Sequence, residues 1–142
     1  VVDSDLQHPP EKIRDIHELL ANGSDIVVGS RTKDLSGWHL HRRLISKVAI
    51  LLGRIRLSIK GVPCKDVMSG FFGARTDQIQ ELLDRKEEIF EKEGYKILFD
   101  ILKNMPRTTK LKEVSYEFGL RKGGESKINK KIIMSYVKSL FK

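Results

Sequence analysis

The sequence predicts an α/β domain with a mostly parallel sheet and flanking helices, and three observations support this class. The chain opens with the apolar pair Val1 and Val2, continues with a helical pattern at 11–21, and then has a β-branched run at 25–29. A strand, a helix and a second strand in so short a stretch form a βαβ unit, whose strands are parallel. The length of 142 residues suits one domain, and 39% hydrophobic residues exclude a fully disordered chain.

The first helix is expected over 11–21. Pro9 and Pro10 would end the preceding strand, because proline cannot donate to a sheet, and proline also suits the first turn of a helix. Asn22 and Gly23 are typical of a helix C-terminus. The apolar residues of this helix fall on one face: Ile13, Ile16, Leu19 and Leu20.

The second helix is expected over 39–59, after the strand at 25–29 and a polar loop at 32–38. Gly61 and Pro63 end it. Its apolar residues form one stripe: Leu40, Leu44, Val48, Leu51, Leu52 and Ile55. Basic residues are interleaved with that stripe: Arg42, Arg43, Lys47, Arg54 and Arg56.

The rest of the chain alternates strands and helices. We expect a strand at 68–74, helices at 76–90 and 94–105, a strand at 111–118, a basic glycine-rich loop at 119–127 and a helix at 128–141. The last helix has its own apolar stripe, which comprises Ile128, Ile132, Ile133, Tyr136, Val137, Leu140 and Phe141.

Charge and cysteine content narrow the function classes. Lys and Arg number 27 and Asp and Glu number 19, so the formal net charge is +8. Such a balance indicates an anionic partner, which is nucleic acid, a phosphate compound or a membrane surface. A single cysteine excludes a disulfide framework and a cysteine-rich zinc site. Because the chain opens on an apolar strand without a Met, we expect it to be a piece of a longer protein.

Asp3 and Asp5 form the first candidate site. Alternate residues of a strand point to the same side, so the two carboxylates converge at the carboxyl end of a buried strand, where α/β sheets bind ligands. Mg²⁺ or Mn²⁺ bridging to a substrate diphosphate fits such a pair, and Gln7 adds a ligand or an outer contact. The alternative is a polar strand end that caps the next helix.

Three further positions suggest phosphate chemistry. Arg31 follows the strand at 25–29, and its guanidinium could bind a phosphate at the same sheet edge. Asp66 lies in a small-residue turn and could orient an acceptor or a cationic neighbour. The glycines and cations of 121–127 form a plausible phosphate-binding loop. The alternatives are a surface arginine, an ordinary turn and a flexible basic loop.

Taken in order, these segments resemble the polyprenyl-phosphate sugar transferases, the dolichol-phosphate mannosyltransferase-like branch of family 2 glycosyltransferases. The segments that carry the resemblance are Val-Val-Asp-Ser-Asp-Leu-Gln-His-Pro-Pro at 1–10, Val-Gly-Ser-Arg at 28–31, Arg42 with Ser46, Asp-Val-Met-Ser-Gly-Phe at 66–71, Glu-Gly-Tyr-Lys-Ile-Leu at 93–98 and Arg-x-x-Gly-Glu-Ser-Lys at 121–127.

The resemblance implies a GT-A fold and inverting transfer of a hexose from GDP-mannose or UDP-glucose to a polyprenyl or dolichyl phosphate. It implies that Asp3, Asp5 and Gln7 surround the divalent metal, with Asp5 and Arg31 central to catalysis. Acceptor phosphate or donor diphosphate would be bound by a larger set, which comprises Arg31, Arg42, Ser46, Asp66, Arg121 and Lys127.

Relatives in this family place a nucleotide-binding half before the metal strand. We therefore expect 1–127 to be the metal and acceptor side of a GT-A catalytic domain, inactive in isolation. We expect 128–142 to be an amphipathic interfacial helix. Together with the helix at 39–59 it would hold the protein on the cytoplasmic face of a membrane. The alternative is that both apolar stripes pack on the sheet.

A phosphate acceptor needs no protein base, because its oxygen is already an anion, so arginines and the metal would offset charge repulsion. Three other interpretations remain open. A relative with a hydroxyl acceptor would need a base, for which Asp66 is the first candidate. A dehalogenase-like phosphatase would use Asp3 as its nucleophile. A basic nucleic-acid-binding module is the non-enzyme alternative. The chain has few aromatic residues on which bases could stack, so we expect no nucleic acid partner.

Overall fold

The computed structural model describes residues 1–3, 7–32, 40–85, 90, 97–117 and 130–141; within these, 40–46, 130–134 and 141 are described by their backbone alone. Helices and strands alternate along the chain, as the α/β class predicts. In order they are α1 (Lys12–Ala21), β1 (Ile26–Thr32), α2 (Leu40–Lys60), β2 (Phe72–Ala74), α3 (Thr76–Arg85), α4 (Ile97–Asn104), β3 (Leu111–Glu117) and α5 (Lys130–Phe141).

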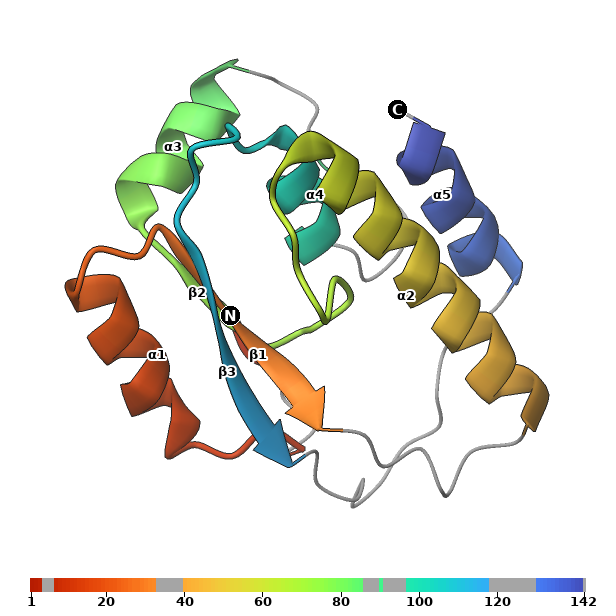
Figure 1. The fold of residues 1–142 in the computed structure, drawn as a ribbon, viewed down its shortest axis with the longest axis horizontal. Helices are drawn as coiled ribbons and strands as arrows, with labels where there is room; N and C mark the ends of the chain where they lie inside the picture. The colour runs from red at the N-terminus through yellow and green to blue at the C-terminus, as the bar shows by residue number, and fades with distance from the viewer. Residues whose placement is uncertain (4–6, 33–39, 86–89, 91–96, 118–129, 142) are drawn as a thin grey trace.

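The described strands form a mixed sheet in the order β2-β1-β3 (Figure 1). β1 runs parallel to β3, from Ile26 opposite Leu111 to Thr32 opposite Glu117. β2 is antiparallel to β1. The sheet is thus less parallel than the sequence predicts, because the loop after α2 enters at the carboxyl end of β1 and β2 starts there.

The predicted strand at Val1 and Val2 is not formed. The two side chains are 67% and 51% exposed, although both backbone groups of Val1 bond to Phe72, at 2.9 Å and 3.1 Å. Phe72 is a residue of β2, so β2 lies between Val1 and β1. The expected first strand is therefore not formed, and β2, a segment distant in the sequence, lies between Val1 and β1.

The sheet is covered on both faces, which explains the continuous β-branched run in β1. One face packs with Ile16 of α1 through Val27, and the other packs with α2, α3, α4 and α5 through Ile26 and Val28. All three of these β1 side chains are fully buried. Gly73 of β2 allows α1 to approach, since a Cβ there would lie 2.6 Å from Ile16 Cγ2.

The remaining boundaries follow the predictions with local differences. α1 ends at Ala21 and is followed by the cap residue Asn22 and by Gly23 at φ 90°, as its sequence predicts. The strand predicted at 68–74 is reduced to 72–74, because Ser69 forms a side-chain turn instead: its hydroxyl accepts from Phe71 N–H at 3.1 Å and donates to Gly29 O at 2.6 Å.

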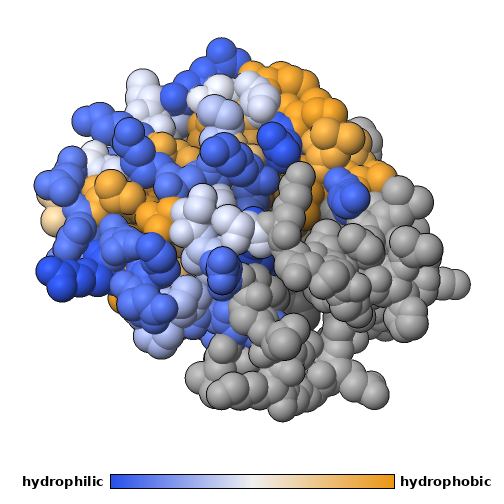
Figure 2. Space-filling model, turned by 60° about the horizontal axis from the view of Figure 1, so that its bottom comes forward, coloured by the Kyte–Doolittle hydropathy of each residue, from blue (hydrophilic) through white to orange (hydrophobic). Residues whose placement is uncertain are grey.

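α2 buries a line of residues other than its predicted apolar stripe. Ala49, Gly53 and Leu57 face the protein at four-residue spacing, and Tyr136 of α5 donates to Ala49 O at 2.6 Å. The stripe itself is 43–55% exposed at the four of its positions whose side chains are described, namely Val48, Leu51, Leu52 and Ile55. Figure 2 shows hydrophobic surface gathered on the right, the side on which α2 and α5 lie in Figure 1.

α5 packs against the body of the protein. Tyr136 and Leu140 of its predicted stripe are buried in the core, and Val137 is partly exposed. A buried polar group joins α5 to α4, where Ser139 donates to Asp100 at 2.7 Å. None of the helices among the described residues has the length and apolar character needed to cross a bilayer.

Candidate active site

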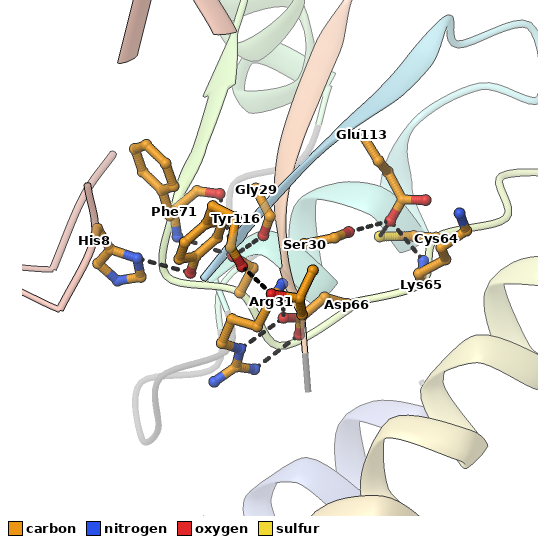
Figure 3. Close-up of polar contacts among 12 residues, drawn as sticks. His8, Gly29, Ser30, Arg31, Cys64, Lys65, Asp66, Phe71, Glu113 and Tyr116 are labelled. Atoms are coloured by element: carbon orange, nitrogen blue, oxygen red, sulfur yellow. Dashed lines mark hydrogen bonds and ion pairs between the residues drawn. The ribbon is translucent and has the colours of Figure 1, made fainter. Parts of the chain in front are cut away.

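A cluster of polar residues lies at the carboxyl ends of β1 and β3 (Figure 3). Arg31 is opposite Tyr116 in the parallel ladder, so both side chains start from the same edge of the sheet. The loop at 61–71, between α2 and β2, brings Asp66 and Ser69 to this edge. The N-terminal segment adds Asp3 and His8.

Arg31 and Asp66 form a two-point ion pair. Arg31 Nε donates to Asp66 Oδ2 at 2.7 Å and Nη2 donates to Oδ1 at 2.8 Å, while the Arg31 backbone N–H also reaches Oδ2 at 3.3 Å. Asp66 is only 7% exposed. Sequence reasoning expected a phosphate-binding arginine and a separate orienting aspartate, and the structure joins the two side chains directly.

The electrostatics of Arg31 reflect this pairing. Burial of the guanidinium alone would lower its pKa, but the hydrogen bonds and charge of Asp66 outweigh burial and raise the pKa above its ordinary value. Asp3 contributes in the same direction, which places its carboxylate within electrostatic reach of Arg31. Arg31 is therefore a permanent cation at the sheet edge.

The loop at 61–71 is attached to the sheet at several points. Ser69 bonds to the backbone of Gly29, and the Gly29 N–H donates to Phe71 O at 2.8 Å. Glu113 of β3 accepts from the Lys65 backbone N–H at 2.8 Å and from the Ser30 hydroxyl at 2.7 Å. These bonds determine where Asp66 lies relative to β1.

Cys64 also lies beside Glu113, with its sulfur 3.7 Å from Oε1. Burial, followed by the negative charge of Glu113, raises the pKa of the Cys64 thiol. A protonated buried thiol is a poor nucleophile, which agrees with the sequence-based view that Cys64 has no catalytic surroundings.

His8 and Tyr116 form a buried pair next to Asp3. Tyr116 Oη lies 2.8 Å from His8 Nδ1, and both rings contact Phe71, at centroid separations of 5.3 Å and 5.1 Å. Burial raises the pKa of the Tyr116 hydroxyl, which therefore keeps its proton at neutral pH. His8 Nε2 lies 3.7 Å from Asp3 Oδ2.

The Asp3 carboxylate lies directly over Gly70. A Cβ at Gly70 would occupy the position of that carboxylate, so a side chain there would displace Asp3 from its present place. The Asp3 side chain is 57% exposed and can still meet a ligand from solvent.

A divalent metal would suit the predicted set of Asp3, Asp5 and Gln7. Their oxygen donors are the kind that Mg²⁺ and Mn²⁺ prefer, and the exposed Asp3 carboxylate over Gly70 fits that use. Asp5 lies outside the described residues, and Gln7 is half-buried. Within the described part of the chain, no three His, Cys, Asp or Glu residues are grouped as a metal site.

The structure thus brings together three of the predicted site residues, Asp3, Arg31 and Asp66. Arg121 and Lys127 lie outside the described residues, and only the backbone of Arg42 and Ser46 is described, in the first turns of α2.

Sequence reasoning missed four polar participants: His8, Ser69, Glu113 and Tyr116. Three of them had a usable signal. His8 directly follows the predicted metal-binding set, Ser69 lies in the segment 66–71 that carries part of the resemblance, and Tyr116 lies on the alternation of β3 that points inward. The role of Glu113 has no local signal, because its partners lie 48 and 83 residues away.

Comparisons with known proteins agree with the family resemblance that the motifs indicate. No protein-family model matches the chain. A curated protein of Pyrococcus furiosus named dolichol-phosphate mannosyltransferase is 41% identical over 146 aligned residues, which cover 100% of this chain and 39% of that protein.

Two fungal proteins of the same name are also similar. The one from Mycosarcoma maydis is 35% identical, covering 98% of this chain and 46% of its own length, and that from Saccharomyces cerevisiae is 33% identical, covering 98% and 52%. The resemblance predicted from the motifs is confirmed. The chain spans between two fifths and about half of the length of the curated relatives it matches.

Proposed function

We propose that this chain is the metal and acceptor side of a glycosyltransferase that moves a hexose from a nucleotide sugar to a polyprenyl or dolichyl phosphate. The names of the similar proteins support this class of reaction. The observation that carries the proposal is the Arg31 guanidinium, held as a permanent cation at the ligand-binding edge of the sheet and within reach of Asp3.

The chemistry of a phosphate acceptor matches these residues. Its oxygen is already anionic at neutral pH, so the reaction needs no proton abstraction by the protein. The difficulty is the approach of one anion to another, and Arg31 reduces that repulsion. The hexose is transferred with inversion because the acceptor oxygen attacks directly from the side opposite the leaving diphosphate.

The metal would be held by Asp3, Asp5 and Gln7. When bound, Mg²⁺ or Mn²⁺ supplies positive charge that stabilises the departing nucleoside diphosphate. Asp3, over Gly70, would present one carboxylate toward it, and the His8–Tyr116 pair lies behind that carboxylate. Arg42, Ser46, Arg121 and Lys127 are proposed to complete the phosphate contacts.

Asp66 argues against the hydroxyl-acceptor alternative. That reaction needs a general base, and Asp66 was its first candidate. Both of its carboxylate oxygens bond to Arg31, and the residue is buried. A carboxylate held in this way is poorly placed to take a proton from an acceptor, so the phosphate acceptor is favoured.

The exposed stripe of α2 supports a membrane-surface location. Leu51, Leu52 and Ile55 are exposed, as are the flanking Lys47 and Arg54. Such a helix lies in the plane of a membrane interface, where each basic residue near anionic lipid adds about 1 kcal/mol. The cytoplasmic leaflet carries negative surface potential, and we therefore place the protein there.

α5 contributes differently from the sequence-based expectation. Its Tyr136 and Leu140 are used in packing against the protein, so they would not insert into lipid. Val137 and Lys138 are exposed and are the described side chains of α5 that can face the interface. α2 is therefore proposed as the main interfacial helix.

The isolated chain is proposed to be inactive, because the nucleotide half of the catalytic domain would have to bind the donor. The choice between GDP-mannose and UDP-glucose is made by that half. A 142-residue polypeptide that turns over donor and polyprenyl phosphate at the rate of the complete enzyme would contradict this.

The test uses the complete enzyme of which this chain is part, with polyprenyl phosphate and each donor in turn. We expect transfer to the phosphate with one donor and none to the free polyprenol. Arg31→Ala is expected to reduce the transfer rate far more than it weakens nucleotide binding. Equal transfer to the free alcohol, or a loss confined to nucleotide affinity, would contradict the proposal.

A further inference from the structure

We infer that Asp66 is a positioning residue that orients the Arg31 guanidinium for the acceptor phosphate and does not itself contact substrate. The inference rests on the proposed function and deepens it. Its starting point is an apparent contradiction: a buried carboxylate lies against the cation that is proposed to attract an anion (Figure 3).

The geometry fixes the plane of the guanidinium. Two parallel bonds, at 2.7 Å and 2.8 Å, join the Nε–Nη2 edge of Arg31 to the two oxygens of Asp66. A planar fork held at two points cannot rotate about its long axis, unlike a single contact. The opposite side of the fork, at Nη1, then points in one set direction from the sheet edge.

The Asp66 carboxylate is itself held in place from several directions. The Arg31 backbone N–H bonds to Oδ2 at 3.3 Å, and the Ser69 N–H donates to the Asp66 carbonyl at 3.2 Å. Cys64 and Lys65, which directly precede Asp66 in the loop, bond to Glu113 of β3. Because the loop at 61–71 is bonded to the sheet, it fixes the orientation of the Arg31 guanidinium relative to the sheet.

Charge alone would disfavour this arrangement. A carboxylate next to Arg31 repels a phosphate and reduces the attraction that Arg31 offers in the ground state. An enzyme gains rate from interactions that are stronger in the transition state than in the bound substrate. Asp66 therefore weakens the attraction of Arg31 for the bound acceptor phosphate, but it fixes the orientation in which Arg31 holds that nucleophile.

The chain contains a second two-point ion pair of arginine and aspartate that is exposed and lies away from the site, and it serves as a control. Arg75 and Asp77 are also joined at two points, at 3.2 Å and 2.8 Å, yet both are exposed and they are two residues apart in the sequence. The backbone of Arg75 bonds to Asp25, at the start of β1 and thus at the opposite end of the sheet from Arg31. Asp77→Asn therefore removes an equivalent pair without touching the site.

The experiment measures steady-state kinetics of the complete enzyme with Asp66→Asn, varying polyprenyl phosphate at saturating donor. Asn keeps the shape of the side chain and removes its charge and one acceptor oxygen. We expect kcat to fall at least about 10-fold, because small misplacement of a positioned group costs up to about 100-fold. The KM for polyprenyl phosphate should be unchanged or lower, since a repulsive charge has been removed.

A double-variant cycle separates this role from general stabilisation. In the Arg31→Ala background Asp66→Asn should have no further effect on kcat, because Asp66 acts through Arg31. This comparison remains usable if Asp66→Asn alone does not fold, because the double variant leaves no unpaired buried charge. Asp77→Asn should match the wild-type enzyme in kcat and KM.

The outcomes distinguish the inference from the proposed function. A wild-type kcat in Asp66→Asn, or a further loss in the double variant relative to Arg31→Ala, overturns the inference while Arg31 keeps its role. A rise in the KM for polyprenyl phosphate with unchanged kcat also overturns it, since Asp66 would then contribute to binding. If Arg31→Ala transfers sugar at the wild-type rate, or the wild-type enzyme does not use polyprenyl phosphate, the proposed function fails first and this inference fails with it.

Discussion

The exposed stripe of α2 leads to a quantitative prediction about membrane binding. Leu51, Leu52 and Ile55 are each about half exposed, and replacing all three by Gln would remove apolar surface without entering the core. Full burial of such a side chain contributes about 1.5–3 kcal/mol, so the exposed half of each contributes about 1 kcal/mol on insertion into lipid. Their combined loss of about 3 kcal/mol corresponds to roughly a 100-fold weaker partition.

The assay is co-sedimentation of the complete enzyme with vesicles that contain anionic lipid, at low and high salt. The Leu51, Leu52 and Ile55 triple-Gln variant should require about 100-fold more lipid for half binding. Its unfolding in urea is measured alongside, because the buried half of each side chain contributes to stability and the variant must be folded in the assay. High salt should weaken the vesicle binding of both proteins, since it screens the attraction of the exposed Lys47 and Arg54 to anionic lipid.

A control variant is available on the other face of the sheet. Ile13 of α1 is 49% exposed, which matches the exposure of the α2 residues, but it lies on the helix that covers the opposite side. Ile13→Gln should bind vesicles as the wild type does. The reasoning is refuted if the α2 variant binds as well as the wild type, or if Ile13→Gln weakens binding to the same extent.

Three further predictions concern the site and its surroundings. Tyr116→Phe should lower the free energy of unfolding by about 1–3 kcal/mol in urea, because it removes a buried hydrogen bond; an unchanged unfolding midpoint would show that the bond contributes nothing. Gly70→Ala should weaken Mn²⁺ binding measured by electron paramagnetic resonance, because a methyl group would displace the Asp3 carboxylate; unchanged affinity would remove Asp3 from the metal set. Burial raises the pKa of Cys64 above its ordinary value of 9.0, so the unfolded thiol ionises first and stability should decline as pH rises above about 9, an effect that Cys64→Ala should reduce in urea unfolding at pH 8 and 10.

Local patterns were sufficient for most of the secondary structure. The helices at 11–21 and 39–59 and the strand at 111–118 agree with α1, α2 and β3 to within about one residue at each end. These elements depend on side-chain periodicity and on terminal signals such as Gly23 and Gly61, which both adopt positive φ. Such signals act within a few residues of the chain, so they can be read from the sequence.

The strand at 68–74 shows where local reading stops being sufficient. Its apolar residues predict a strand, but the hydroxyl of Ser69 bonds to Gly29, 40 residues away, and the segment before Phe72 turns. That turn is what delivers Asp66 to Arg31. The competing interaction comes from another strand, so no window of neighbouring residues contains it.

The composition and motifs of this chain determined its α/β class, its basic character and the resemblance that the similar proteins bear out. Only the tertiary structure decided three further points: that β2 separates Val1 from β1, that Arg31 is joined to Asp66, and that α2 buries the line through Gly53 and leaves its apolar stripe exposed. The physical reason is the range of the forces involved. Periodicity and capping are set by neighbours along the chain, whereas strand order, ion pairing and the choice of buried face depend on residues that folding brings together from far apart.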